Sequence, residues 1–276
     1  MRTAHALPAG LALALFTILA DGNLALADPP SSQEFLGRYQ GQHYLILSPA
    51  AVLEPPPSGW PILVFLHGYN ERGQDVERLR YNNTPPGRYA KLDVLHRNFL
   101  LIAPQLASTE RFWNPVRLRA LLRQALDGWP VDWSRLTLTG LSIGATGVWD
   151  YVTHFPEEVS AAASFSGIAR PTLVDPDLRP FAFDYEAPVL APWQRENPAL
   201  ARVPFMAFHC EADLFIPFRA AARMVIELNK LGNENARIIP VPGCGHGSWP
   251  RYYKLEASLP GNGDRSIYDW LLNPLE

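Results

Sequence analysis

The sequence is poor in cysteine, lacks an excess of basic residues and has few long apolar runs. Its 276 residues include two cysteines, so a framework of several disulfides is excluded. No group of cysteines and histidines has metal-ligand spacing. Lysine and arginine number 24 against 27 acidic residues, without a basic stripe, so we expect no nucleic-acid partner. A phosphate loop of the form G-x-x-x-x-G-K-[ST] is also missing. These absences argue against a disulfide-rich scaffold, a metal site, a nucleic-acid partner and a phosphate-binding loop.

The one marked apolar run lies at the N-terminus. After Arg2, residues 7–20 are apolar except for one threonine, and this is shorter than the roughly 20 residues that span a membrane. Ala25–Ala27 offers small residues at a cleavage site. We therefore expect a signal peptide over 1–27 and an exported, periplasmic or secreted protein over 28–276, with no stable membrane insertion. An uncleaved anchor is the alternative.

Short apolar runs alternate with amphipathic ones along the rest of the chain. Strands are predicted over residues 43–47, 61–66, 99–103, 136–139, 161–165, 203–208 and 236–241. Helices are predicted over residues 118–126, 143–154, 218–231 and 266–272. This alternation is typical of the α/β class, with a mostly parallel sheet, helices on both faces and ligands at the carboxyl ends of the strands.

One irregular segment interrupts this pattern over residues 168–202. It contains six prolines and several aromatic residues, among them Trp193. Loops of this length within a domain are uncommon and often cover a functional site. The segment either covers a site or is a passive excursion on the surface.

Gly140-Leu141-Ser142-Ile143-Gly144 matches the pattern G-x-S-x-G between a predicted strand and a predicted helix. In this context the serine lies on a tight turn above the edge of the sheet, and only glycine fits at the flanking positions. The pattern predicts that Ser142 is a nucleophile. The alternative is a small residue in a glycine-rich bend.

A serine nucleophile needs a base, and the base needs an acid. His246 lies in a glycine-rich loop after the last predicted strand, and Asp213 follows the strand before it. Glu211 competes with Asp213 for the role of the acid. The order Ser142, Asp213, His246 is the order of the triad in α/β-hydrolases. Histidines beside strands or on helices are expected to be structural: His67, His96, His154 and His209.

An oxyanion hole is expected from the N–H of Ile143 and from the loop "LVFLHGYNERG", where Gly68 permits a tight turn. The Tyr69 N–H is the predicted second donor, with its phenol as an alternative. Trp249, just after the base, and Trp193 are candidates for lining a substrate pocket, although Trp249 could equally belong to the core.

These motifs resemble the esterase branch of the α/β-hydrolase superfamily, near feruloyl esterases, polyhydroxybutyrate depolymerases and sequences described as predicted peptidases. The resemblance extends over about residues 61–272 and includes "FLLIAPQ", "HCEADLFIPF", "PGCGHGSW" and "SIYDWLL". It implies a serine carboxylic-ester hydrolase without a cofactor, acting on a small or polymer-linked ester. It also implies Ser142, Asp213 and His246 as triad. A prolyl-oligopeptidase-like peptidase and a non-catalytic carbohydrate- or polymer-binding protein are the alternatives, and the oligomeric state stays open.

The chain departs from these relatives at a few positions. Ala145 stands where glycine is usual, beside the predicted oxyanion donor. Cys210 and Cys244 also replace residues of other types, three residues before the predicted acid and two before the predicted base. We hypothesise a disulfide that joins the acid loop to the base loop, with two unpaired buried thiols as the alternative.

Overall fold

The computed structural model describes residues 32–50, 53–80, 84–169, 188–261 and 263–276. Within these residues eight strands form one sheet in the order β1-β2-β4-β3-β5-β6-β7-β8. The strands are β1 (Gln33–Tyr39), β2 (Gln42–Ser48), β3 (Trp60–Leu66), β4 (Leu100–Pro104), β5 (Val131–Leu141), β6 (Val159–Phe165), β7 (Phe205–Cys210) and β8 (Ala236–Val241). All neighbouring strands from β4 to β8 pair in parallel, whereas β2 pairs antiparallel with β1 and β4.

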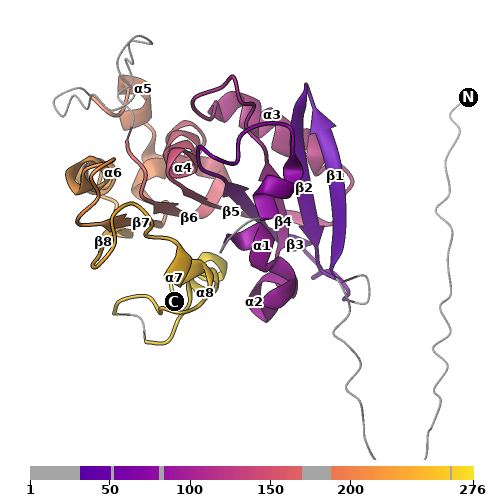
Figure 1. Ribbon diagram of the computed structural model, residues 1–276. Helices are drawn as coiled ribbons and strands as arrows, with labels where there is room; N and C mark the ends of the chain where they lie inside the picture. Colours follow the sequence, from indigo (N-terminus) through magenta and orange to yellow (C-terminus); the bar gives the residue numbers. More distant parts are fainter. Residues whose placement is uncertain (1–31, 51–52, 81–83, 170–187, 262) are drawn as a thin grey trace, which may run out of the picture.

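Helices cover both faces of this sheet (Figure 1). One face packs against α3 (Pro115–Ala125), α4 (Ile143–His154) and α6 (Phe218–Lys230). The other packs against α2 (Asp93–His96), α7 (Pro250–Tyr253) and α8 (Ile267–Leu272). The remaining helices are α1 (Pro85–Arg88), α5 (Pro192–Arg195) and the 3₁₀ helices η1 (Val76–Arg80), η2 (Tyr89–Lys91), η3 (Pro156–Glu158) and η4 (Pro198–Ala201).

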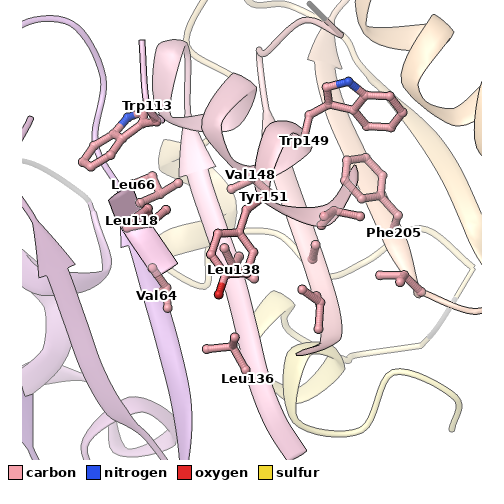
Figure 2. Close-up of a cluster of buried hydrophobic side chains, with 14 of the residues drawn as sticks. Val64, Leu66, Trp113, Leu118, Leu136, Leu138, Val148, Trp149, Tyr151 and Phe205 are labelled. Atoms are coloured by element: carbon pink, nitrogen blue, oxygen red, sulfur yellow. The ribbon is translucent and has the colours of Figure 1, made fainter. Parts of the chain in front are cut away.

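Successive side chains of a strand point to opposite faces of the sheet, so the core forms two buried clusters, one on each face. Each cluster packs the sheet against its helices. In β3, Val64 and Leu66 belong to the cluster under α3 and α4, whereas Leu63 and Phe65 belong to the opposite one. Figure 2 shows the first cluster, in which Trp149 of α4 lies against a phenylalanine of β7. A strand buried on both sides needs a continuous apolar run, and the sequence supplies one in β3.

The predicted α/β class and its main elements are confirmed. The bounds predicted for α4 and β8 agree with the structure, and the other long elements differ by a few residues. The structure adds β1, which the sequence pattern did not indicate. This strand pairs with β2 through a hairpin whose turn residues, Gln40 and Gly41, have φ angles of 45° and 85°. Most of its side chains are exposed, so it carries no apolar alternation.

Two predictions fall on residues outside the described part of the chain. The expected signal peptide over 1–27 is one of them, and the central part of the irregular segment, residues 170–187, is the other. Among the described residues, no helix has the length and apolarity that a membrane crossing requires.

Five parallel strands end at the same edge of the sheet and place the loops of interest side by side. These are β3, β5, β6, β7 and β8. The loop that contains Gly68 and Tyr69 follows β3, Ser142 follows β5, and the loops that contain Asp213 and His246 follow β7 and β8. The parallel topology therefore gathers at one edge residues that lie far apart in the sequence.

Candidate active site

Ser142 lies between β5 and α4 in a backbone conformation that side chains seldom adopt. Its φ and ψ angles are 53° and −120°. A Cβ added at Gly144 would lie 2.0 Å from the Leu66 carbonyl oxygen, and one at Gly140 would lie 2.8 Å from the same atom. Glycine is thus required on both sides, as the pattern predicted. The strained turn carries a partly exposed serine at the edge of the sheet.

His246 and Asp213 meet Ser142 in a continuous hydrogen-bonded row. The Ser142 Oγ is 3.0 Å from the His246 Nε2, and the His246 Nδ1 is 2.8 Å from the Asp213 Oδ2. Only Asp213 is buried, with a side chain fully removed from solvent, whereas the His246 side chain retains 24% exposure. The competing candidate, Glu211, is exposed. The structure therefore brings together the three residues predicted as nucleophile, base and acid.

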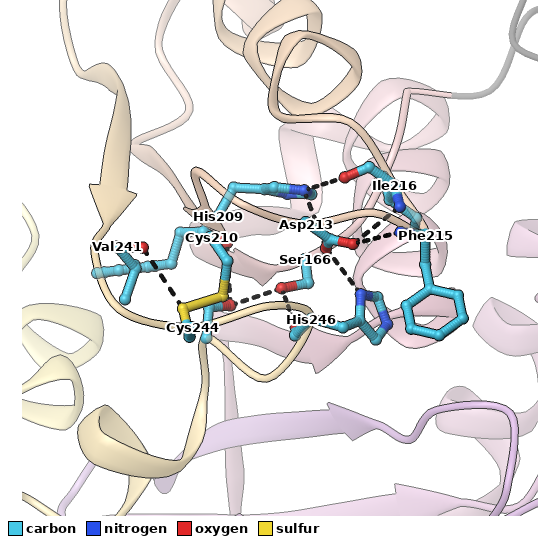
Figure 3. Close-up of a disulfide and its surroundings, with 11 residues drawn as sticks. Ser166, His209, Cys210, Asp213, Phe215, Ile216, Val241, Cys244 and His246 are labelled. Atoms are coloured by element: carbon cyan, nitrogen blue, oxygen red, sulfur yellow. Dashed lines mark hydrogen bonds and ion pairs between the residues drawn. A yellow bond between two sulfur atoms is a disulfide. The ribbon is translucent and has the colours of Figure 1, made fainter.

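Hydrogen bonds hold both oxygens of the Asp213 carboxylate. Its Oδ1 accepts from the backbone N–H groups of Phe215 and Ile216, each at 2.9 Å. Its Oδ2 faces the His246 Nδ1, as Figure 3 shows. An acid fixed in this way can select the His246 tautomer whose Nε2 is free to accept a proton.

Ser166 supports the base loop, a role that the sequence analysis missed. It follows β6 directly, is fully buried and has a φ angle of 54°. Its Oγ donates to the His246 carbonyl oxygen at 2.6 Å and lies 2.8 Å from the Ser248 Oγ. Its place at the carboxyl end of the strand beside β5 was the signal in the sequence that could have identified it.

A disulfide joins Cys210, the last residue of β7, to Cys244 in the base loop (Figure 3). The two Cα atoms are 5.5 Å apart. Since Asp213 and His246 follow these cysteines by three and two residues, the bond ties the acid loop to the base loop. This is the pairing hypothesised from the two departures in the sequence.

The loop after β3 packs against the turn at Ser142. A Cβ at Gly68 would lie 2.6 Å from the Leu141 Cδ1, so this loop approaches the turn at Ser142 closely. His67 is fully buried and bridges the Gly68 carbonyl oxygen, at 2.6 Å, and the Leu106 N–H, at 2.9 Å. Burial is the main cause that lowers the pKa of His67 to about 4. His67 is thus a neutral structural histidine, as expected.

Arg72 fixes the position of Tyr69 in the same loop. Its Nε donates to the Tyr69 carbonyl oxygen at 3.0 Å, and its guanidinium lies 3.5 Å from the centre of the Tyr69 ring. The Nη1 donates further to the carbonyl oxygens of Ser108 and Glu110. The phenol ring is thus stacked under a guanidinium, and this favours the Tyr69 N–H as the donor from this loop. Ile143, the first residue of α4, has an N–H without a partner inside the helix.

Two aromatic rings lie beside the His246 ring. The Phe215 ring centre is 5.6 Å from the His246 ring centre, and the Trp249 ring centre is 5.8 Å from it. Trp249 is half-buried and packs against the core, and its role in a substrate pocket stays a prediction. Phe215 is 63% exposed, and its neighbour Leu214 is 94% exposed.

Trp193, which the sequence predicts to line a substrate pocket, lies far from Ser142. Its ring lies 5.3 Å from that of His154, the last residue of α4. Ser142 lies at the other end of this 12-residue helix, about 18 Å away at 1.5 Å per residue. The order of residues in an irregular segment does not reveal its path over the surface, and aromatic content alone was an insufficient signal.

The methyl group of Ala145 does not enter the site. Ala145 is fully buried and packs closely on Gly167. A Cβ added at Gly167 would lie 2.5 Å from the Cβ of Ala145. The departure from glycine therefore changes the contact between α4 and the residues after β6, not the space beside Ser142. No group of three potential metal ligands occurs among the residues that the structure describes.

No protein-family model matches the sequence. No curated protein matches it significantly either. Solved structures are similar in fold. A thermostable esterase superposes with a TM-score of 0.60 at 23% identity, over 82% of this chain and 60% of that protein. S-formylglutathione hydrolase from Staphylococcus aureus gives a TM-score of 0.60 at 15% identity, over 88% and 99% of the two chains. A ferulic acid esterase gives 0.58 at 14% identity, over 81% and 94%.

These similarities define the class of structure. The chain has the α/β-hydrolase fold, with a mostly parallel eight-stranded sheet in its described residues. It spans about three-fifths of the length of the thermostable esterase.

Proposed function

We propose that this protein is a serine hydrolase that cleaves carboxylic esters through an acyl-enzyme. The observation that carries the proposal is the row Ser142–His246–Asp213, with contacts of 3.0 and 2.8 Å, at a strained turn between strand and helix. Serine is a weak nucleophile until an adjacent base can accept its proton. A buried carboxylate that orients this base completes the arrangement.

The acylation step uses the groups already in contact. The Ser142 Oγ attacks the ester carbonyl carbon while the His246 Nε2 accepts the hydroxyl proton. The N–H groups of Ile143 and Tyr69 donate to the oxygen that becomes negatively charged. The protonated His246 then donates its proton to the leaving alkoxide, and the acyl group stays on Ser142.

Deacylation reverses these roles with water. His246 accepts a proton from water as its oxygen attacks the acyl carbon, and it returns the proton to the Ser142 Oγ as the carboxylic acid leaves. Both steps need a neutral imidazole at His246, because only the unprotonated ring can accept a proton.

Exposed apolar side chains beside the base support an ester with an apolar alcohol. His246 donates to the leaving group, so the residues that flank its ring face that part of a substrate. The Phe215 ring, which lies beside that of His246, is 63% exposed, and the half-buried Trp249 ring also lies beside it. Apolar surface held beside a reacting centre gains free energy when a ligand covers it.

We also propose that the protein acts outside the cytoplasm. The predicted signal peptide and the disulfide between Cys210 and Cys244 support this, because disulfides persist in oxidising compartments. Release of residues 1–27 on export, read by the mass of the mature N-terminus, tests it. A product that stays in the cytoplasm with these residues attached would contradict it, whereas an exported product that keeps them would indicate the uncleaved anchor.

The ester hydrolase is tested by turnover of p-nitrophenyl esters of increasing acyl length and of the matched p-nitroanilides. We expect turnover of the esters, a loss of about 10⁴-fold or more in Ser142→Ala, and little cleavage of the anilides. Ser134→Ala, at an exposed position of β5, is the matched control and should retain full activity. Preferred cleavage of anilides would indicate a peptidase, and equal slow hydrolysis by wild type and Ser142→Ala would indicate a binding protein.

A further inference from the structure

A second histidine, His209, contacts the proposed catalytic acid from the side opposite His246. It is the fifth residue of β7 and is fully buried. Its Nε2 lies 2.8 Å from the Ile216 carbonyl oxygen and 3.3 Å from the Asp213 Oδ2. Figure 3 shows Asp213 between the two imidazoles. The sequence alone predicts only a structural role for His209.

The surroundings of His209 define its protonation state. Both atoms that face Nε2 are acceptors, so this nitrogen must carry the proton. Burial lowers the pKa of His209, which favours the neutral ring. Its Nδ1 is buried without a hydrogen-bond partner among the described residues. His209 is therefore a neutral donor whose single N–H is shared between a carbonyl oxygen and the Asp213 carboxylate.

This contact completes the set of groups around the acid. Two backbone N–H groups, those of Phe215 and Ile216, hold Oδ1. The Oδ2 faces the two imidazoles at 2.8 and 3.3 Å. Without His209, Oδ2 would keep His246 as its single imidazole contact, and the Ile216 carbonyl oxygen would lose its donor. A carboxylate in a fully buried position depends on each donor for its charge and orientation.

We propose that His209 is a positioning residue of the active site. It does not touch the substrate, and it acts through Asp213: its Nε2–H holds Oδ2 in line with the His246 ring and stabilises the ionised carboxylate. This inference rests on the proposed ester hydrolysis for its catalytic readout, although the contact itself can be tested without turnover.

Two substitutions at His209 separate hydrogen bonding from packing. The amide nitrogen of glutamine reaches the position of Nε2, so His209→Gln keeps a donor to Asp213. Leucine fills a similar volume without a donor. We expect His209→Gln to retain kcat within threefold, and His209→Leu to lose about tenfold or more with KM unchanged within twofold, since hydrogen bonds to charged groups contribute about this much.

A double-mutant cycle with Asp213→Asn distinguishes positioning from a merely structural role. In the Asp213→Asn background there is no carboxylate to position, so adding His209→Leu should lower kcat by less than twofold. The same tenfold loss in both backgrounds would overturn the proposal. His96→Leu is the matched control, because His96 is also buried, lies near an aspartate and has an unpartnered Nδ1, but belongs to α2. It should retain full kcat.

A proton spectrum tests the contact independently of turnover. The His246 Nδ1–H bonded to a carboxylate gives a low-field resonance, which we expect in the wild type and in His209→Gln and expect to exchange away in His209→Leu. Its persistence in His209→Leu would overturn the proposal. Full ester turnover in Ser142→Ala would instead reject the proposed function while leaving this spectral result intact.

Discussion

At the scale of single residues, chemistry made the three side chains of the proposed triad predictable. The glycines around Ser142 meet a steric requirement, because a Cβ added at Gly144 would lie 2.0 Å from the Leu66 carbonyl oxygen. Asp213 and His246 could be found because each follows a predicted strand in the expected order. His209 and Ser166 could not be assigned their contacts from the sequence, because these depend on which strands lie side by side and on the exact path of two loops.

The apolar flank of the base leads to a prediction on specificity. Phe215→Ala should lower kcat/KM about tenfold for benzyl acetate and much less for methyl acetate, because only the larger alcohol covers the ring and a buried apolar side chain contributes about 1.5–3 kcal/mol. Steady-state kinetics on the two acetates measure this. Val116→Ala removes a side chain of similar exposure on α3 and is the control. An equal loss on both acetates would contradict a contact with the alcohol.

At the scale of elements, periodicity predicted the long helices and the buried strands. The strand β1 was not predicted, because most of its side chains are exposed and its pairing with β2 rests on backbone hydrogen bonds. The path of residues 188–202 escaped for a related reason. Short helices such as α5 and η4 have too few residues for a period to be read, and their position depends on contacts with α4 and α6.

The disulfide connects β7 to the loop that contains His246, and we expect it to stabilise the whole fold. It closes a loop with a sequence separation of 34 residues. For loops of this length the chain-entropy treatment gives about 4 kcal/mol. The double substitution Cys210→Ser with Cys244→Ser should lower the free energy of unfolding by about that amount in urea titrations.

Dithiothreitol provides the internal control for this prediction. It should lower the stability of the wild type toward that of the double variant and leave the variant unchanged. A difference below about 1 kcal/mol, or two thiols that alkylate in the native protein without reductant, would contradict the role assigned to the disulfide.

At the scale of the whole molecule, buried neutral histidines link stability to pH. The pKa of His67 is lowered from 6.5 to about 4 on folding, mainly by burial. The unfolded chain therefore binds more protons than the folded protein between these values. The neutral His67 ring therefore contributes fully to the free energy of unfolding above pH 6.5. This contribution is lost as the pH falls toward 4, by up to about 3 kcal/mol.

Urea titrations between pH 4 and 7 measure this loss. His67→Gln should reduce the dependence of unfolding free energy on pH in this window, although it also removes two hydrogen bonds and lowers stability at every pH. An unchanged slope in His67→Gln would contradict the assignment. Because burial also lowers the pKa of His209, some acid sensitivity should remain in this variant.

The topology of the whole molecule also explains why the predicted site residues lie close together. Parallel strands end at one edge, so residues separated by up to 104 positions, such as Ser142 and His246, come within hydrogen-bond distance. The α/β class was readable from alternation alone. The shape of the surface that would bind a substrate was not, because it is formed by loops whose course depends on the packed structure.

The central claim is that Ser142 is a nucleophile activated by His246. Labelling with a fluorophosphonate, followed by peptide mass mapping, tests it most directly. We expect one adduct per chain, located on Ser142, with its rate of formation reduced at least 10³-fold in His246→Ala. We also expect no adduct in Ser142→Ala. An adduct on another serine, or ester turnover that persists once Ser142 is fully labelled, would contradict this claim.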